Sequence, residues 1–524
     1  KLAFGVNGYL MNYNRPNAGD NAIFGLATTY SPHITPVRYS NGQWPYLAGT
    51  AINPYQAMTQ SGIQNSYQNA IRSNIKLTQQ LGFITEGLSV SGMFAFDANF
   101  DSNLHRGRTF SGYFAEGRDD QGNLITRITR EGTENLDFLL TRYSLRKMYT
   151  EAALNYSRSF GLHEVGGLFL FNQSDMADGK SNVDTYIEAI PYRQRNIVGR
   201  ATYAFDKKYL LEGNFSYSGS DNFDPNNRYG LFSSLGLGWV ASNEQFFEPL
   251  KNTINHLKFR YSYGSSGNAS LQNSEYRFLY LSQFANNGGS YTFGSPGSTR
   301  SFTGYNELLI GAPVSWETSY RHNLGLEMYL FNSELQFTME LFKEDRKGIL
   351  LRDLQIPYNS GFSSGNLPFL NIGETKNKGI DATLEYNKKV VDGFFMARGT
   401  FNYNVNEAVK DNLPPWRYPY LDRDGHRISQ RFGYIDMGLF KSDEEIANAA
   451  VQAGDVRVGD IRYKDLNGDG VINSNDQTAI GYGDVPSIIY GLTLGGGYKG
   501  FDISLFFQGA GMVDLNYSSG FAVT

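Results

Sequence analysis

The chain has no cysteine, so neither a disulfide framework nor a thiolate metal site is available to it. No run of about 18 apolar residues occurs, which excludes transmembrane helices. Charged residues make up only 19% of the 524 residues, and the net charge is a modest -5, without the basic stripe that nucleic-acid-binding proteins carry. We therefore expect neither a helical membrane protein nor a nucleic-acid partner.

Aromatic residues and glycine are abundant instead, with 36 Tyr, 37 Phe and 58 Gly. This profile suits many strands and turns, with aromatic girdles at the two interfaces of a membrane. A β-barrel can cross a bilayer at low mean hydropathy because only alternate residues of each strand face lipid.

The clearest strand pattern lies in residues 323–342, where two alternating stretches flank an Asn-Ser-Glu turn. The apolar positions are Leu324, Leu326, Met328 and Leu330 before the turn, and Leu335, Phe337, Met339 and Leu341 after it. Successive side chains of a strand point to opposite faces, so the pattern predicts an antiparallel hairpin with one apolar and one polar face.

The same pattern recurs along nearly the whole chain and predicts about 15 strands. Long loops are expected at about residues 15–66, 98–140, 175–193, 266–314, 346–377 and 407–486. Every long loop falls on one rim of the sheet and every short turn on the other. That rhythm is typical of a transmembrane antiparallel β-barrel, with extracellular loops and periplasmic turns. Soluble β-sandwiches or a propeller are the alternative, but no blade-length repeat is present.

An odd number of strands is unusual for a single-chain bacterial barrel, and an open sheet would expose its edges to lipid. We therefore expect the chain to be a piece of a larger barrel that lacks strands at one or both ends. It opens directly in a strand without a signal peptide, so its N-terminus is expected to be incomplete. Lys258 and Arg260 occupy the polar face of one strand, which fits a water-filled lumen.

A calcium-binding pattern lies in the longest loop. The predicted ligands are Asp465, Asn467, Asp469, the carbonyl of Val471, Asn473 and Asp476. Gly470 falls where the loop must turn sharply, but Asp476 stands where a bidentate Glu is usual. The expected role of Ca²⁺ is structural, stiffening an extracellular loop beneath a partner. The alternative is an Asx-rich turn that holds no metal.

Aromatic clusters in two long loops are candidates for substrate contact: Trp44 and Tyr46 in the first loop, and Trp416, Arg417, Tyr418 and Tyr420 in the last. Flat rings beside amides and arginine suit stacking on sugar faces, as they also suit protein interfaces. The alternative is loop packing or contact with a covering protein.

No catalytic constellation is present. The stretch G-F-S-S-G at residues 361–365 formally matches a nucleophile elbow, but it lies in a Pro- and Asn-rich loop without an evident strand-to-helix context. The six His are scattered, without paired metal-binding spacing, and Asp119 and Asp120 are most simply solvated loop residues. We expect no enzymatic activity.

Several longer stretches carry a family resemblance. They are N-N-R-Y-G-L-F at 226–232 with G-L-G-W at 236–239, L-K-F-R-Y-S-Y-G at 257–264 with G-N at 267–268, V-S-W-E-T at 314–318, N-I-G-E at 371–374 with N-K-G-I at 377–380, and G-D-I-R-Y-K-D-L-N-G-D-G at 459–470. With them the chain resembles the SusC/RagA-like family of TonB-dependent outer-membrane transporters. Ser233 departs from the family, which usually has proline there.

The resemblance implies a barrel of about 22 strands with an N-terminal plug. It also implies energy from the TonB–ExbB–ExbD complex and a SusD-like surface lipoprotein as a lid. The location would be the outer membrane of a Gram-negative, Bacteroidetes-like bacterium, and the cargo oligosaccharides or, in some members, peptides. Residues 1–524 would be barrel only; the plug, the TonB box and the final strands are not among them. A peptide or siderophore receptor of the same architecture, or a surface-binding barrel that does not transport, are the alternatives.

Overall fold

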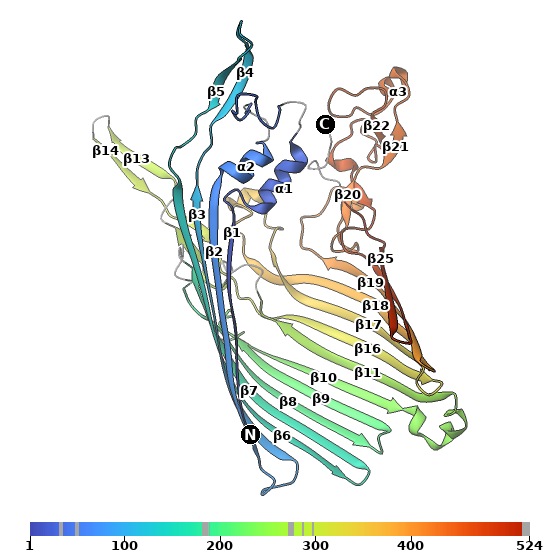
Figure 1. Ribbon diagram of the computed structural model, residues 1–524. Helices are drawn as coiled ribbons and strands as arrows, with labels where there is room; N and C mark the ends of the chain where they lie inside the picture. Colours follow the sequence, from blue (N-terminus) through green and yellow to red (C-terminus); the bar gives the residue numbers. More distant parts are fainter. Residues whose placement is uncertain are drawn as a thin grey trace.

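One antiparallel sheet organises the computed structural model, which describes residues 1–30, 35–47, 52–180, 187, 189–270, 277–285, 288–295 and 298–515 (Figure 1). The sheet has 15 strands, and each is hydrogen-bonded to the strand of this sheet that comes before it in the chain. They are β1 (Leu2–Pro16), β2 (Gly62–Gln80), β3 (Leu88–Gly107), β6 (Asp137–Phe160), β7 (His163–Lys180), β8 (Tyr192–Phe205), β9 (Tyr209–Ser220), β10 (Tyr229–Val240), β11 (Ile254–Asn268), β16 (Glu317–Leu330), β17 (Leu335–Arg352), β18 (Phe369–Val390), β19 (Gly393–Lys410), β24 (Ile488–Tyr498) and β25 (Phe501–Gly511). The predicted number of strands is confirmed.

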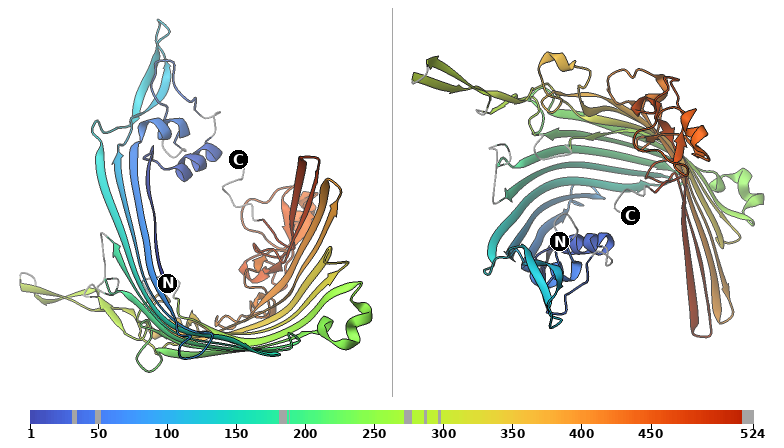
Figure 2. Two further views of the ribbon diagram at one scale, coloured as in Figure 1. Left: turned by 60° about the horizontal axis from the view of Figure 1, so that its bottom comes forward. Right: turned by 90° about the horizontal axis from the view of Figure 1, so that it is seen from above.

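Figure 2 shows that the sheet curves into a trough, with β1 and β25 at its two margins. Within the described residues these two strands are each hydrogen-bonded to one neighbour only, β2 and β24. No helix in the described part of the chain is long and apolar enough to cross a membrane.

Each strand of the sheet has two chemically different faces, as β9 illustrates. Leu211, Phe215 and Tyr217 leave more than two fifths of their surfaces exposed. Glu212 and Asn214 point to the opposite face, where Glu212 accepts hydrogen bonds from Asn214 and from Arg200 of β8. The exposed apolar face is the one that a membrane barrel turns to lipid, and the polar face is the one that it turns to its lumen.

Loops and turns divide between the two ends of the strands, which we call the long-loop rim and the short-turn rim. Among the residues that the structure describes, the long-loop rim carries three α-helices, α1 (Asp20–Thr29), α2 (Pro54–Gln60) and α3 (Asp443–Ala447). It also carries short strand pairs, β4–β5 (Gly112–Arg118 and Leu124–Arg130), β12–β15 (Gln283–Ala285 and Asn306–Leu309), β13–β14 (Ser290–Ser295 and Ser298–Thr303), β20–β23 (Arg431–Gly433 and Thr478–Ile480) and β21–β22 (Asp436–Leu439 and Ile461–Tyr463). Parts of the predicted loops 15–66, 175–193 and 266–314 lie outside the described residues.

The short-turn rim differs from the prediction at one connection. Between β10 and β11 the chain forms two 3-10 helices, η1 (Ala241–Asn243) and η2 (Gln245–Leu250), instead of a tight turn. Glu244 holds them against the sheet, because its carboxylate accepts hydrogen bonds from Tyr209 at 2.6 Å and Trp239 at 3.2 Å. Seven residues join β2 to β3, and the other turns on this rim are tight. In one of them Asp206 and Lys207 take φ values of 51° and 52°, the left-handed geometry that suits a hairpin's twist.

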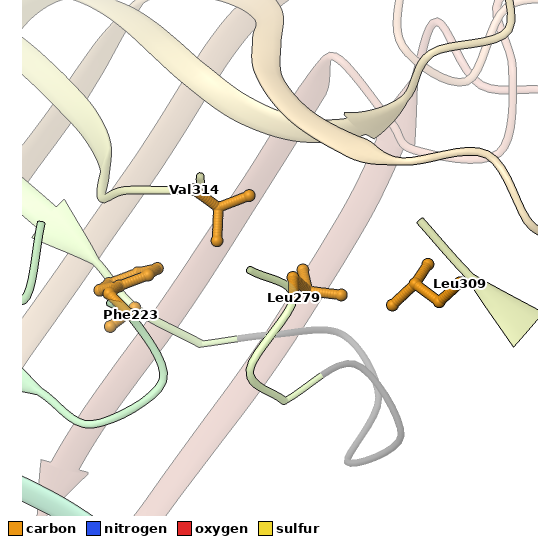
Figure 3. Packing of buried hydrophobic residues seen from close by; sticks show 5 residues of the cluster. Phe223, Leu279, Leu309 and Val314 are labelled. Carbon is orange, nitrogen blue, oxygen red and sulfur yellow. The ribbon is translucent and has the colours of Figure 1, made fainter. Parts of the chain in front are cut away.

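A small hydrophobic core lies beneath the long-loop rim. It contains Phe223, Ala269, Leu279, Leu309 and Val314, four of which are labelled in Figure 3. These residues come from two different rim connections, those between β9 and β10 and between β11 and β16. The two loops therefore share one packed interior.

Arg277 joins three rim loops and is fully buried. Its guanidinium donates to the carbonyls of Ile190 and Pro191 in the β7–β8 connection, the second at 3.1 Å. It also donates to Asn222 at 3.2 Å and pairs with Asp221 at 3.3 Å in the β9–β10 connection. Burial lowers the pKa of Arg277 and raises the pKa of Asp221, while the attraction between the two charges opposes both shifts.

Candidate functional site

The polar face of the sheet carries a charged network across three neighbouring strands. Arg260 of β11 lies 3.1 Å from Glu327 of β16 and is also hydrogen-bonded to Glu340 of β17. Lys258 lies 3.5 Å from Glu327, and Asn323 donates to Glu340 at 3.0 Å. Charges at this depth of a membrane protein are tolerated when they are paired and face an aqueous or protein interior. Lys258 and Arg260 thus share one polar face with carboxylates of the next two strands, and the water-filled lumen on that side stays a prediction.

Two of the resemblance stretches converge where the strands reach the long-loop rim. Trp316 packs against Phe223 and Phe232, with ring centroids 5.4 and 5.3 Å away, and its Nε1 donates to the carbonyl of Arg228 at 3.3 Å. The N-N-R-Y-G-L-F and V-S-W-E-T stretches are therefore two parts of one contact.

The N-I-G-E stretch completes that contact from β18. The Asn371 side chain accepts from the Ser315 N–H at 2.7 Å and donates to the carbonyls of Ser315 at 2.9 Å and Gly348 at 2.7 Å. Glycine is required at position 267, where β11 passes the Phe232 ring, because a Cβ there would lie 1.9 Å from that ring. These residues fix the shape of the rim.

The predicted calcium loop forms a series of Asx turns. Asp465 accepts the N–H groups of Gly468 at 2.7 Å and Gly470 at 2.8 Å. Asn467 and Asp469 each accept the N–H two residues ahead at 2.9 Å. The N–H of Gly470, which outweighs the effect of burial, holds the pKa of Asp465 below its usual range. The Asp465 carboxylate therefore stays ionised to a lower pH than a free aspartate does.

Asp476 closes this loop from within, since it is fully buried. Its two carboxylate oxygens accept the N–H groups of Leu466 and Asn473, both at 2.9 Å. The oxygen that accepts from Leu466 also accepts the Asn467 N–H at 3.5 Å, so a cation would need asparagine and carbonyl oxygens as ligands beside the carboxylates. Across the described residues no three His, Cys, Asp or Glu side chains are grouped to hold a metal ion. The calcium site stays a prediction.

The last-loop aromatic cluster packs against the calcium loop. Tyr420 donates from its hydroxyl to the carbonyl of Asn475 at 2.8 Å, and its ring stacks on Tyr418 with centroids 5.4 Å apart. Arg417 lies 5.3 Å over the other ring, while Trp416 remains 43% exposed. Burial, aided by Tyr418 and the carboxylates of the loop, raises the pKa of Tyr420. Trp416 therefore offers the freest ring of this cluster.

Trp44 and Tyr46 lie on another part of the long-loop rim, beside β4. The N–H of Tyr46 donates to the carbonyl of Tyr113, and the N–H of Tyr113 donates to that of Trp44, both at 2.9 Å. Arg38 lies 4.9 Å over the Trp44 ring and Arg130 lies 5.3 Å over the Tyr46 ring. These rings are engaged in loop packing, and their contact with a substrate stays a prediction.

A cavity that the sequence did not reveal lies where the last excursion, residues 411–487, folds back over the polar ends of β16–β19. Its volume is about 510 Å³. Its lining combines apolar residues, among them Leu350, Phe369 and Phe432, with Lys410, Arg423 and Arg427. No local pattern marks this cavity, because its lining residues come from strands and loops that lie far apart in the chain.

Comparisons with known proteins agree with this architecture. The family model described as "TonB dependent receptor-like, beta-barrel" matches residues 4–509. TonB-dependent receptor P3 of Formosa agariphila is 28% identical over 417 residues, which cover 76% of this chain and 39% of the relative. TonB-dependent receptor SusC of Bacteroides thetaiotaomicron is 24% identical over 546 residues, which cover 96% of this chain and 51% of the relative. The chain thus spans about half, or less, of the length of these relatives.

A solved structure of the RagAB peptide transporter superposes with a TM-score of 0.64 at 18% identity, over 97% of this chain and 55% of that one. At this identity the likeness shows the fold. The chain belongs to the TonB-dependent receptor-like β-barrel family. Within it, the similarity to SusC and the RagAB fold agrees with the predicted SusC/RagA-like type. The predicted fold class and outer-membrane location are confirmed, and the family consists of receptors and transporters, not enzymes.

Proposed function

We propose that the chain forms much of the wall of an outer-membrane importer for oligosaccharides. A SusD-like surface lipoprotein covers the long-loop rim, and the TonB–ExbB–ExbD complex supplies the work through a plug and TonB box outside residues 1–524. The observation that carries this proposal is the charged network of Arg260, Glu327 and Glu340 on the polar face. A barrel that only displayed loops at the cell surface would not need ionised groups on the polar face of its membrane-spanning strands.

The choice of an oligosaccharide rests on the composition of the rim. The exposed Trp416 ring and the many Asn, Ser and Tyr side chains of the loops suit sugar faces and hydroxyls. Peptide import is the second candidate, because the superposed RagAB structure is named a peptide transporter. A siderophore receptor or a surface-binding barrel has no comparable observation in its favour.

We also propose a structural Ca²⁺ in the last excursion. The oxygens of Asp465, Asn467 and Asp469, the Val471 carbonyl and Asp476 would bind it, with Asn473 directly or through water. Its effect would be to stiffen the surface on which the lipoprotein sits.

The first experiment is mass spectrometry of what co-purifies with the tagged full-length protein in mild detergent. A stoichiometric surface lipoprotein supports the lidded importer. A barrel that comes out alone contradicts it and favours a lidless receptor or an adhesin.

Uptake by cells separates the remaining alternatives. Labelled oligosaccharide, peptide and ferric siderophore are each offered to cells with and without a functional TonB. TonB-dependent entry of the oligosaccharide is expected. Entry of the peptide alone would replace our proposal with the second candidate, and binding without entry of any probe would indicate a non-transporting barrel.

A further inference from the structure

The cavity of about 510 Å³ beneath the last excursion has an unusual balance of charge. Its lining holds four cationic side chains, Arg346, Lys410, Arg423 and Arg427, against two carboxylates, Glu317 and Asp411. Glu317 is already paired with Arg346 at 3.2 Å. The other three cations form no ion pair with any carboxylate in the described part of the chain.

Two of these cations are positioned by neutral groups. Arg427 donates to the hydroxyl of Ser487 at 2.6 Å and lies 5.1 Å over the Tyr482 ring. Arg423 lies 5.3 Å over the Phe432 ring. Such contacts orient a guanidinium without neutralising it, and they leave N–H donors free to bind a planar or tetrahedral anion.

Apolar side chains form much of the remaining lining, among them Ile349, Leu350, Leu351, Phe369 and Phe432, beside the polar Asn268, Ser270, Thr375 and Gln430. A concave site of this size with an apolar floor and a few convergent charged groups is typical of a ligand pocket. Asp411 is the one unpaired carboxylate of the lining, and one of its oxygens accepts the Leu413 N–H at 3.2 Å. The cavity therefore keeps a surplus of positive charge.

We propose that this cavity binds an anionic group of the cargo, and that the imported oligosaccharide is acidic, carrying carboxylate or sulfate. The inference rests on the proposed import function and narrows its substrate class. The guanidinium groups of Arg423 and Arg427 and the ammonium of Lys410 bind the anion, while the apolar floor receives the sugar ring beside it.

Binding is measured with the full-length protein and its co-purifying partner in detergent. The probes are a uronic-acid tetrasaccharide, a sulfated tetrasaccharide, a neutral tetrasaccharide and hexaglutamate. We expect one or both acidic sugars to bind at least about tenfold more tightly than the neutral sugar, with an affinity that falls as salt is raised. Which of the two binds identifies the anion.

The test variant is the double substitution Arg423→Gln with Arg427→Gln, and it should weaken acidic-sugar binding at least about tenfold. Lys410→Gln is a second variant should the first fail to fold. Arg457→Gln is the matched control, because Arg457 lies on the same excursion but pairs with Asp455 at the surface. This control variant should bind the acidic sugar with unchanged affinity.

Equal affinity for neutral and acidic sugars, or acidic-sugar binding that survives both cavity variants, would overturn the inference. Binding of hexaglutamate alone would also overturn it and assign the cavity to an acidic peptide. TonB-dependent uptake of the neutral sugar, unchanged in the double variant, would reject the acidic substrate while leaving the importer intact. Absence of uptake of every sugar would instead reject the proposed function.

Discussion

Replacing Arg277 by Met tests how the long-loop rim is held together. The substitution keeps an unbranched side chain but removes a buried guanidinium with partners in two other loops. Removing one member of a buried ion pair usually costs about 3–5 kcal/mol, because the remaining charge is left uncompensated. Asp221 keeps about a fifth of its side chain exposed, so we expect the low end, about 3 kcal/mol.

The loss should be local. The strands below keep their hydrogen bonds, so the global unfolding transition of the barrel should not move. A local cost of about 3 kcal/mol raises the opening equilibrium of the attached loops by roughly 150-fold. Hydrogen–deuterium exchange by mass spectrometry should therefore show much faster exchange in residues 189–193 and 219–223, with β16–β19 unchanged.

The double variant Arg277→Met with Asp221→Asn is the control. Because the stranded carboxylate is then neutral, it should recover about 1–2 kcal/mol of the loss. Exchange in Arg277→Met that matches the parent protein would refute the reasoning, since it would mean that Arg277 carries no share of loop stability. Faster exchange through the whole sheet would refute the claim that the effect is local.

Three further predictions concern the rim. Gly267→Ala should lower the free energy of unfolding of the barrel by about 1–3 kcal/mol in urea titrations, because the added Cβ collides with the Phe232 ring. Adding Phe232→Leu should restore part of this loss. If the effects of the two substitutions simply add, the collision is contradicted. Chelation of calcium should speed protease cleavage within residues 455–485 without unfolding the barrel, and unchanged cleavage would count against the metal. Because the pKa of Asp465 is lowered in the folded loop, its contribution to loop stability is present above about pH 4 and is lost as the pH falls through the pKa of the folded state. Protease cleavage of the loop should therefore rise in acid in the unsubstituted protein but not in Asp465→Asn. Identical pH profiles of cleavage in the two proteins would exclude Asp465 as the cause.

The sheet could be predicted from the sequence because its main signal is local. Alternation with period two requires only that one face meets lipid and the other water, and β9 and β16 follow it closely. The prediction ended β17 too early, since that strand continues to Arg352. Above the membrane both faces are wet, so the alternation fades while the ladder to β16 and β18 continues.

The candidate sites differ in the same way: those formed by one short segment could be predicted, and those formed by distant segments could not. The calcium-binding pattern could be recognised because its oxygens are spaced along one short segment, and the site itself stays a prediction. The cavity of Lys410, Arg423 and Arg427 could not, because it forms only when the excursion folds back over the ends of four strands. Arg277 was missed for the same reason: its partners lie more than 50 residues away in the chain.

The shared core of the rim has a consequence for how such a transporter can acquire a new cargo. Loops whose side chains meet in one interior, as Phe223, Leu279 and Val314 do, cannot be exchanged singly without leaving a void or a collision. The excursion between β19 and β24 has paired strands and a buried Asp476 of its own, but it shares the same interior, because its Arg423 and Phe432 line one cavity with Phe223 and Leu279. Its outer part can therefore vary in sequence alone, whereas its residues that line the cavity must change together with the strands and loops beneath them.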